Sequence, residues 1–410
     1  MRLIDRGNTV SIFAAVMTGQ GMGAIATVQV LGDSAETILR EVFQRKNGQS
    51  FEPTVGRVLL GGIVEDGAIL DEVTMGCEGP GLFAVHCHGN PLLVERIMGL
   101  LQRRGVEVIP AGQLLARILA RHKTLDSIAV EAKLALATVK TLEGAAILAN
   151  QVEGGLSEKV RQWRDHLDSI ALEEIATEAG DILKHSEPAR LIISGCTIAL
   201  VGPPNTGKST LLNTLAGREK AIVSDIRGTT RDWVSAEIHI PPLAATIIDT
   251  AGLDSAITVS AGVDRAAQQK SVGIIERADL ILLVLDLSQP IEQLPVSVDR
   301  QLFGRRVVTV LNKADLPPQV DVSRLPRHLG DTVQISAKQG TNIDDLIRAI
   351  RGVCGVAALD PRVPVAFTGR QRRLLEALRH SDSEVKAYAI LREFLESPPL
   401  GTGGKPSVGV

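Results

Sequence analysis

The chain has 410 residues, of which 44% are hydrophobic and 22% are charged, and its formal net charge at pH 7 is −3. This length predicts two or three domains, and the composition is typical of a soluble globular protein. The small net charge gives no overall attraction to nucleic acid or anionic lipid. Only two Trp, one Tyr and seven Phe are present, which argues against a base-stacking surface, so an RNA contact would need local basic clusters.

Cysteine spacing and hydropathy indicate the cellular compartment. The four cysteines are widely spaced and form no CxxC pair, which favours a reducing compartment over a disulfide framework. They are Cys77, Cys87, Cys196 and Cys354. The short apolar run SIFAAVM (11–17) is followed directly by TGQGMG, which favours a buried strand over a signal peptide. No apolar run reaches the roughly 18 residues of a membrane span, so we expect a cytoplasmic protein without a membrane contact.

Residues 1–112 alternate short apolar runs with glycine-rich turns and predict a small α/β or α+β domain. The expected strands are ATVQVLG (26–32), GRVLLGGIV (56–64) and GLFAVHCHG (81–89). The expected helices are SAETILREVF (34–43) and PLLVERIMGLLQRRG (91–105). His86 and His88 would face one side of their strand; two imidazoles could start a metal site, but a packed or hydrogen-bonded strand end is favoured because no third ligand is evident.

From about residue 113 to 187 the pattern changes to helical spacing. Apolar residues recur in alternating steps of four and three from Ile128 to Ala149, which predicts one long helix, and the same spacing restarts from Leu156 to Ile170. Helical spacing returns after about 360 in GRQRRLLEALRH and SEVKAYAILREFLE. We therefore expect a helical domain, 113–190 plus 360–410, that is split by an inserted domain.

The inserted segment, 191–358, predicts an α/β domain. Near-continuous apolar runs separated by helical segments indicate a mostly parallel sheet that is covered on both faces. The four runs are LIISGCTIALVG, AATIIDT, LILLVLD and RVVTVLNK.

A phosphate-binding loop follows the first of these runs. The segment from Gly202 to Ser209 fits the pattern GxxxxGK[ST] between a strand and a helix. Loop N–H groups at a helix N-terminus bind phosphate oxygens, Lys208 is expected to reach the β- and γ-phosphates, and Ser209 is expected to bind Mg²⁺. The predicted nucleotide-binding residues of this loop are Asn205, Thr206, Gly207, Lys208, Ser209 and Thr210.

The segment NKAD (312–315), which directly follows an apolar run, identifies the base. Asp315 can accept hydrogen bonds from N1–H and the 2-amino group of guanine, and adenine lacks both donors. ISAK (335–338) would support the base from the other side. The sequence thus predicts GTP as the ligand, with base contacts from Asn312, Lys313, Asp315, Ser336, Ala337 and Lys338.

Two further segments are expected to sense the γ-phosphate. In DTAG (249–252), Asp249 would hold Mg²⁺ through water and the Gly252 N–H would meet the phosphate. In RGTTRD (227–232), Thr230 would complete the Mg²⁺ shell only when the γ-phosphate is present. The predicted binding residues are Ser224, Asp225, Ile226, Arg227, Gly228, Thr229, Thr230, Asp249, Thr250, Ala251 and Gly252.

The set GPPNTGKS, SDIRGTTRD, DTAGL, NKAD and SAK resembles the TrmE–Era–Der group of translation-linked GTPases. Within that group, three further segments are similar, in order, to landmarks of the MnmE (TrmE) family of tRNA-modifying GTPases. They are TGQGMGAIATVQVLG (18–32), HCHGNPLL (86–93) and GGLSEKV (154–160). The resemblance covers nearly the whole chain, strongly at 190–350 and weakly at the ends.

The resemblance implies GTP hydrolysis and modification of the wobble uridine of certain tRNAs with a MnmG-type partner. It also implies a tetrahydrofolate derivative bound in the N-terminal domain, a homodimer formed through that domain, and a K⁺ ion between G domains. The K⁺ ligands it implies are Asn205, Ser224, Ile226 and Thr229. A monovalent cation beside the β–γ bridge would neutralise charge that develops during hydrolysis.

The N-terminal part departs from the family pattern at positions that concern the folate. Met22 and Gln29 stand where the family carries arginines, and Pro80 and Gly81 stand where it carries an acidic pair. These departures remove polar anchors that a charged pterin–glutamate ligand would need, and they argue against folate binding.

The catalytic position departs as well. Leu253 stands where many small GTPases carry a water-orienting glutamine, as is usual in this family, and the family's catalytic glutamate aligns with Val259. Valine can neither orient nor deprotonate water, and Asp254 is the only nearby carboxylate that could substitute. Two hypotheses stay open: an MnmE-like GTPase in tRNA modification, or a regulatory GTP switch with slow hydrolysis and no tRNA-modifying chemistry.

One cluster of basic residues has two interpretations. It could contact tRNA phosphates, or it could be ordinary surface charge on a helix. The cluster consists of Arg370, Arg372, Arg373 and Arg379.

Overall fold

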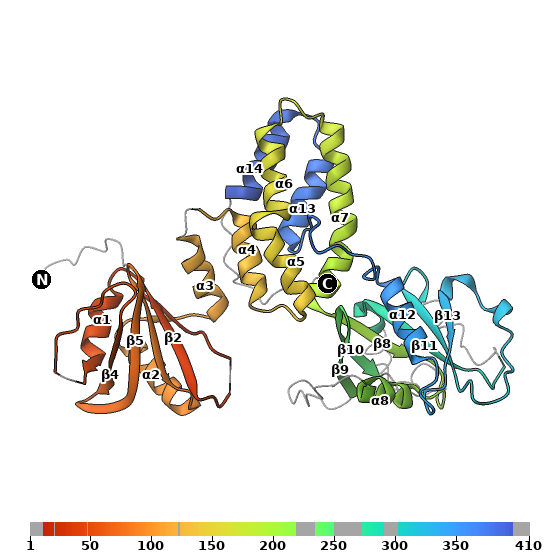
Figure 1. Cartoon of the computed structure of the whole chain (residues 1–410), viewed down its shortest axis with the longest axis horizontal. Coiled ribbons are helices and arrows are strands. Elements are labelled where there is room, and N and C mark those ends of the chain that lie inside the picture. The colour runs from red at the N-terminus through yellow and green to blue at the C-terminus, as the bar shows by residue number, and fades with distance from the viewer. Residues whose placement is uncertain are drawn as a thin grey trace, which may run out of the picture. The chain divides into compact units, whose positions relative to one another are not determined.

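The computed structural model describes residues 11–19, 21–46, 48–121, 124–218, 234–249, 273–290 and 302–396. These residues form two compact units, one up to Leu125 and the other from Asp126 onward (Figure 1). The second unit contains both the helical segments and the α/β segment. The three-domain division with bounds at 112, 190 and 358 is finer than this and stays a prediction.

The first unit is built on a seven-stranded sheet with the order β3-β4-β5-β6-β2-β1-β7, in which only the pair β1–β7 is parallel. The strands are β1 (Phe13–Val16), β2 (Ile25–Leu31), β3 (Phe43–Arg45), β4 (Val58–Glu65), β5 (Ala68–Gly79), β6 (Leu82–His88) and β7 (Glu107–Val108). The helices are α1 (Ala35–Val42), α2 (Pro91–Arg103) and α3 (Ala111–Ala120). The α+β class and the three predicted strands are confirmed, and the apolar run at 11–17 contains β1.

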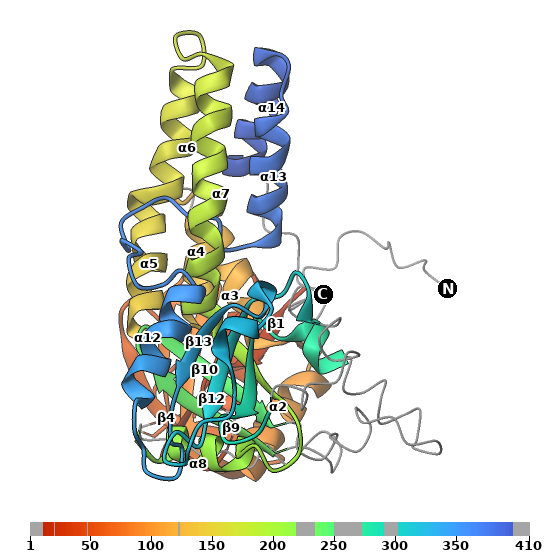
Figure 2. The same cartoon turned by 90° about the vertical axis from the view of Figure 1, so that its right-hand side faces the viewer.

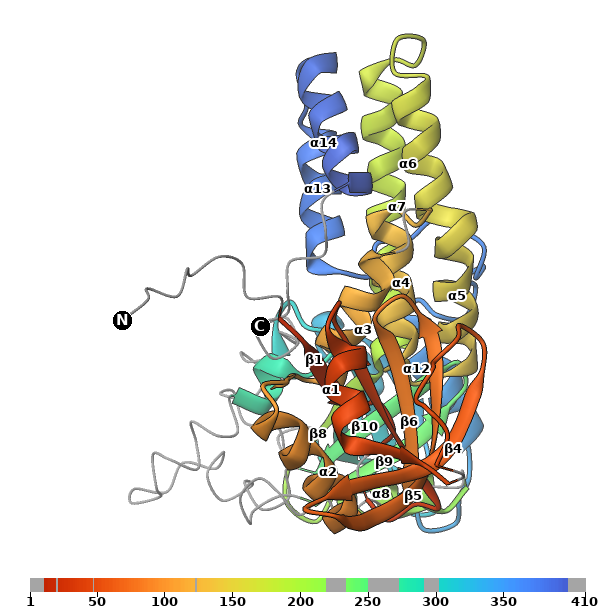
Figure 3. The same ribbon diagram turned by 90° about the vertical axis from the view of Figure 1, so that its left-hand side faces the viewer.

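The helices of this unit cover different faces of the sheet. Leu39 of α1 and Ile97 of α2 are buried in one cluster with Val28 and Val30 of β2 (Figure 3). Leu114 of α3 packs in a separate cluster with residues of β1 and β2 that alternate with those of the first cluster. Because alternate side chains of a strand point to opposite faces, α3 lies on the other face from α1 and α2.

In the second unit, helices from both ends of the chain segment form one bundle. They are α4 (Ser127–Leu136), α5 (Leu142–Glu153), α6 (Gly155–Asp165), α7 (Leu172–Ser194), α13 (Gly369–Arg379) and α14 (Glu384–Glu396). Trp163 of α6, Leu375 of α13 and Phe394 of α14 are fully buried in the same hydrophobic cluster. Figure 2 shows α6, α7, α13 and α14 side by side, so segments before and after the α/β part share one core.

Two expectations about these helices are wrong in detail. The stripe from Ile128 to Ala149 is not one helix, because Thr141 accepts a hydrogen bond from Gly144 N at 2.9 Å and so caps a new helix, α5. The first apolar run of the α/β part is not all strand either. Its beginning is the last turn of α7, which ends at Ser194. Gly195 follows with φ of 90°, and the strand begins only at Cys196.

The α/β part is a six-stranded sheet with the order β13-β12-β11-β8-β10-β9, parallel except for the pair β9–β10. Its strands are β8 (Cys196–Val201), β9 (Val234–Ile240), β10 (Leu243–Asp249), β11 (Leu280–Asp286), β12 (Val307–Asn312) and β13 (Asp331–Gln334), and its longer helices include α8 (Lys208–Arg218) and α12 (Ile343–Val353). Buried clusters lie on both faces, which confirms the predicted mostly parallel sheet. No helix in the described ranges is long and apolar enough to cross a membrane.

Candidate nucleotide-binding site

The predicted phosphate-binding loop lies between the carboxyl end of β8 and the first residue of α8, Lys208. Two of its glycines are required by close packing. A Cβ atom on Gly202 would collide with the carbonyl oxygen of Val284, and one on Gly207 would collide with the side chain of Asn312. Both glycines, and Asn205, have positive φ, so the loop conformation needs residues that tolerate this region. The strand–loop–helix order expected from the sequence is confirmed.

Lys208 is buried beneath this loop, with 4% of its surface exposed. Its Nζ donates hydrogen bonds to the carbonyl oxygens of Gly202 and Pro203, each at 2.8 Å. The ammonium is thus held inside the loop, beside the N-terminus of α8, where both the charge and the helix dipole favour an anion. Thr206 Oγ1 donates to the same Pro203 carbonyl at 3.0 Å, which further fixes the loop.

The two residues expected to act on Mg²⁺ are in contact. Ser209 Oγ, in the first turn of α8, donates a hydrogen bond at 2.7 Å to Oδ2 of Asp249, the last residue of β10. Asp249 is 6% exposed, whereas Ser209 is exposed. A hydroxyl and a carboxylate oxygen are ligands that Mg²⁺ prefers, so these two side chains fit a magnesium site next to the loop.

The residues expected to recognise the base meet at the carboxyl ends of β12 and β13. Asn312 Nδ2 donates to the Thr206 carbonyl oxygen at 2.8 Å, and Asn312 Oδ1 accepts from Ala337 N at 2.9 Å. Ser336 Oγ donates to Asp315 Oδ1 at 2.7 Å. This hydrogen bond lowers the pKa of Asp315, so the carboxylate stays ionised and able to accept from guanine. Two further described residues of the predicted set, Thr210 and Lys338, are exposed. Thr210 follows Ser209 in the sequence, and Lys338 follows Ala337.

The sequence did not single out Asp286, the last residue of β11. Asp286 Oδ2 accepts a hydrogen bond from Lys313 Nζ at 2.6 Å. Burial raises the pKa of Asp286, but hydrogen bonds from Lys313 and Ser288 outweigh it and lower the pKa overall. The signal was present in the sequence, because a buried parallel strand that ends in a carboxylate places it at the same edge as the phosphate loop.

Other residues of the predicted site lie outside the described residues. They are Ser224, Asp225, Ile226, Arg227, Gly228, Thr229, Thr230, Thr250, Ala251, Gly252, Asp254 and Val259. Of the K⁺ ligands only Asn205 is described, and of the two direct Mg²⁺ ligands, Ser209 and Thr230, only Ser209 is described, so both metal assignments stay predictions.

The two histidines on β6 have hydrogen-bonding partners. His88 Nδ1 and the buried Asp71 Oδ1 are 2.6 Å apart, and the main-chain N–H of His88 donates to Asp71 Oδ2 at 2.8 Å. His86 Nδ1 lies 3.0 Å from Thr27 Oγ1. Within the described ranges, no group of three or more His, Cys, Asp or Glu side chains could hold a metal ion. These contacts favour the hydrogen-bonded strand end over the metal site.

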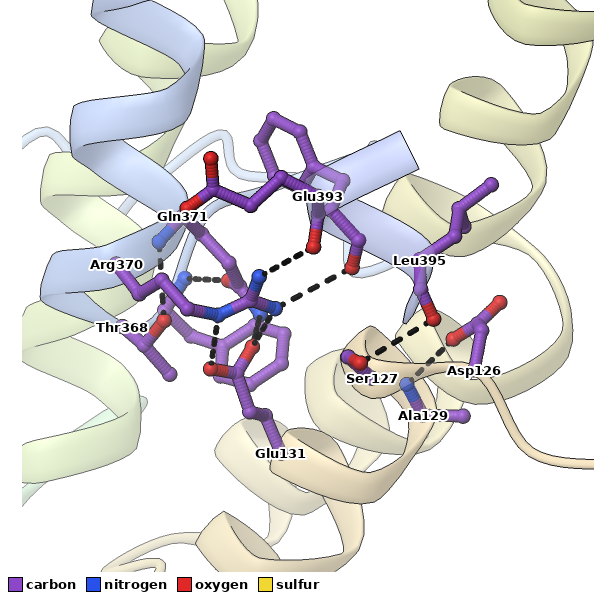
Figure 4. A network of polar contacts seen from close by, with 11 residues as sticks. Asp126, Ser127, Ala129, Glu131, Thr368, Arg370, Gln371, Glu393 and Leu395 are labelled. Atoms are coloured by element: carbon purple, nitrogen blue, oxygen red, sulfur yellow. Dashed lines mark hydrogen bonds and ion pairs between the residues drawn. The ribbon is translucent and has the colours of Figure 1, made fainter. Parts of the chain in front are cut away.

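The prediction that Arg370 belongs to a cluster of surface arginines is wrong. Its guanidinium is largely buried and forms two hydrogen bonds, of 2.8 and 2.9 Å, with the buried carboxylate of Glu131 on α4 (Figure 4). It also donates to the carbonyl oxygens of Glu393 and Phe394 near the end of α14. A buried guanidinium with these partners joins three helices and is not available to RNA.

Comparison with known proteins agrees with this geometry. A family model described as "50S ribosome-binding GTPase" matches residues 197–313. The tRNA modification GTPase MnmE of Heliobacterium modesticaldum is 30% identical over 427 aligned positions, which cover 95% of this chain and 90% of that protein. The chain belongs to the MnmE family. MnmE proteins of Clostridioides difficile (28% identity, 92% of this chain and 87% of that protein) and Bacillus subtilis (29%, 85% and 83%) are also similar.

A solved structure of the G domain of the Thermotoga maritima FeoB iron transporter is 23% identical and covers 38% of this chain and 98% of that one, with a TM-score of 0.29. A similarity this low says nothing about the activity of the chain. Membership of the MnmE family and the matched GTPase model, in contrast, identify the chain as an MnmE-like GTPase that uses GTP and Mg²⁺.

Proposed function

We propose that this MnmE-family GTPase acts in the modification of tRNA wobble uridines, as a homodimer and together with a MnmG-type partner, in the cytoplasm. The extent of the similarity carries the proposal. It covers 95% of this chain, so the N-terminal unit and the helical bundle are shared with proteins named tRNA modification GTPases, and not the G domain alone.

Deletion of the gene tests this proposal. Mass spectrometry of nucleosides from total tRNA should show loss of the modified wobble uridine, and the intact gene should restore it. Unchanged modification in the deletion strain would overturn the proposal. A second gene for a complete MnmE would have to be deleted in parallel, because it could supply the same activity.

Slow hydrolysis is the second part of the proposal. Val259 stands at the position of the family's catalytic glutamate, and general base catalysis typically contributes about 10²- to 10⁴-fold to a rate. We expect Val259→Glu to raise kcat for GTP at least tenfold, and K⁺ to stimulate turnover more than Na⁺. Fast K⁺-stimulated turnover in the unchanged chain that survives Asp254→Ala would contradict the proposed impairment. The regulatory switch is the alternative that slow hydrolysis favours.

The tetrahydrofolate derivative has weaker support. Gln29 Nε2 on β2 donates a hydrogen bond to Glu78 Oε2 on β5 at 2.6 Å. Met22 is apolar and 91% exposed. Neither residue offers a cation to a folate carboxylate. Calorimetric titration with 5-formyltetrahydrofolate should give no measurable heat of binding, and saturable binding would show that other residues supply the anchors.

A further inference from the structure

A groove with a volume of about 670 Å³ is lined by residues of α7 and α13, two helices that lie side by side (Figures 1 and 2). Its charged lining is mostly basic, with four cationic side chains and two carboxylates. The cations are Lys184, Arg372, Arg373 and Arg379, and the carboxylates belong to Asp181 and Glu376. The chain as a whole has a net charge of −3, so this is a local concentration of positive charge.

The cations of the groove are available to a ligand to different degrees. Arg372 is held by Glu187, with Nη2 and Oε2 2.8 Å apart. Lys184 and Arg379 form exposed ion pairs within their own helices, and such pairs contribute little and are readily exchanged. The side chain of Arg373 is exposed and makes no hydrogen bond or ion pair with any other residue that the structure describes. Arg373 and Arg379 are therefore the guanidinium groups that an anion can reach most easily.

The arrangement suits an extended polyanion better than a single anion. Arg372 and Arg379 are seven residues apart on α13, which is two helical turns or about 10 Å along the axis. The lining also includes the small residues Ala176 and Gly180 of α7. A Cβ atom on Gly180 would lie 3.4 Å from Arg379 Nε, an ordinary contact distance, so the Arg379 side chain passes close to α7 at this position. Planar guanidinium groups bind phosphate through two parallel hydrogen bonds, which ammonium groups cannot do.

We propose that the groove between α7 and α13 binds the phosphate backbone of RNA, with tRNA as the source. This inference rests on the proposed function for the choice of tRNA, and on the groove for the position of binding. An acidic protein segment also carries negative charge, but its carboxylates would face Asp181 and Glu376 without the dense, regular charge by which RNA outweighs such repulsion.

Replacement of the two most accessible arginines tests the proposal in the full-length, GTP-bound protein. With bulk tRNA as the probe, R373A/R379A should bind about tenfold more weakly near 100 mM KCl, and the slope of log K against log [KCl] should decrease by about 2. R348A/R392A is the matched control. It removes the same charge from two exposed arginines that pair with acidic residues of their own helices but do not line the groove. GTP affinity should be unchanged in both variants.

The outcomes separate this inference from the proposed function. If the unchanged protein binds tRNA and both double variants bind it equally well, the groove is not the RNA site, although the proposed function stands. If the unchanged protein binds no tRNA at all, the proposed function itself fails and the inference fails with it. If polyglutamate binds with the same dependence on Arg373 and Arg379 and tRNA does not, the occupant is an acidic polypeptide and the proposal for RNA is overturned.

Discussion

The side-chain amide of Asn312 donates a hydrogen bond to the main-chain carbonyl of Thr206 over 2.8 Å, and so ties the end of β12 to the phosphate-binding loop. The oxygen of the same amide accepts from Ala337 N. One buried side chain thus joins the phosphate part of the candidate site to both segments of its base part. This makes Asn312 a positioning residue, whose effect on the nucleotide passes through the loop.

We expect Asn312→Ala to weaken GTP binding about tenfold or more, because two buried hydrogen bonds are lost and each leaves a main-chain group without its partner. The measurement is titration with a fluorescent GTP analogue. Asn213→Ala, at an exposed position of α8, is the control and should bind as the unchanged protein does. An unchanged affinity in a folded Asn312→Ala protein would show that the loop holds its shape by itself.

Asp315→Asn tests the assignment of the base. An asparagine presents one acceptor and one donor, whereas guanine offers two donors at N1 and the 2-amino group, so GTP affinity should fall by at least 10²-fold. Xanthine carries an oxygen in place of the 2-amino group, so the variant should gain affinity for xanthosine triphosphate. Competition between the two nucleotides for one fluorescent probe measures both changes. Equal loss for both nucleotides would mean that Asp315 supports the fold of the site and does not read the base.

Local sequence patterns were sufficient for the parallel sheet and the phosphate loop, but not for the helical bundle. The glycines at 202 and 207 lie between an apolar strand and a helix that are close in sequence, so one short window contains the whole signal for the loop. The spacing from Ile128 to Ala149 is the same whether the helix is continuous or restarted. Thr141 caps the second helix through Gly144 N, and its hydroxyl also donates to the carbonyl oxygen of Ile192 on α7, a contact over 51 residues that the spacing does not reveal. The burial of Arg370 could not be predicted from the local pattern either, because its partner Glu131 lies 239 residues away in the sequence.

Glu187 of α7 should make the stability of the second unit depend on pH. It contacts Arg190, Arg306 and Arg372 at 2.9, 3.5 and 2.8 Å, so it links α7 to the approach to β12 and to α13. Burial alone would raise its pKa, but hydrogen bonds and charge from Arg190 and Arg372 lower the pKa from 4.5 to about 2. A carboxylate with a lowered pKa stabilises the folded state above pH 4.5, and this contribution is lost as the pH falls from 4.5 toward 2.

Urea denaturation of the Glu187→Gln variant checks this dependence. At pH 7 we expect a loss of about 1 to 2 kcal/mol, after discounting the pKa shift for solvent screening, and the difference from the unchanged protein should shrink as the pH falls from 4.5 toward 2. Glu143→Gln, at an exposed position in the first turn of α5, is the control. A loss that is the same at pH 7 and pH 3 would assign the effect to packing and not to charge.

The buried pair of Glu131 and Arg370 should be the strongest single polar contact in the bundle. Gln371 Nε2 also donates to Glu131 Oε2, at 2.6 Å, so Glu131→Ala leaves a buried cation and a buried amide without their acceptor. We expect this variant to lose about 3 to 5 kcal/mol of unfolding free energy, and Arg370→Ala to lose a similar amount. Urea denaturation of both single variants and the double variant gives the coupling energy of the pair.

Because burial of two charges is itself costly, the double variant Glu131→Leu/Arg370→Met should recover part of this stability, although Gln371 Nε2 still loses its acceptor. Such recovery would show that the ion pair adds little to the stability of the bundle, and that its main effect is to specify how α4, α13 and α14 pack together. The tRNA affinity of a folded Glu131→Leu/Arg370→Met protein should equal that of the unchanged chain, because Arg370 faces the inside of the bundle. A tenfold loss of tRNA affinity in that variant, with GTP binding intact, would place Arg370 back among the residues that reach RNA.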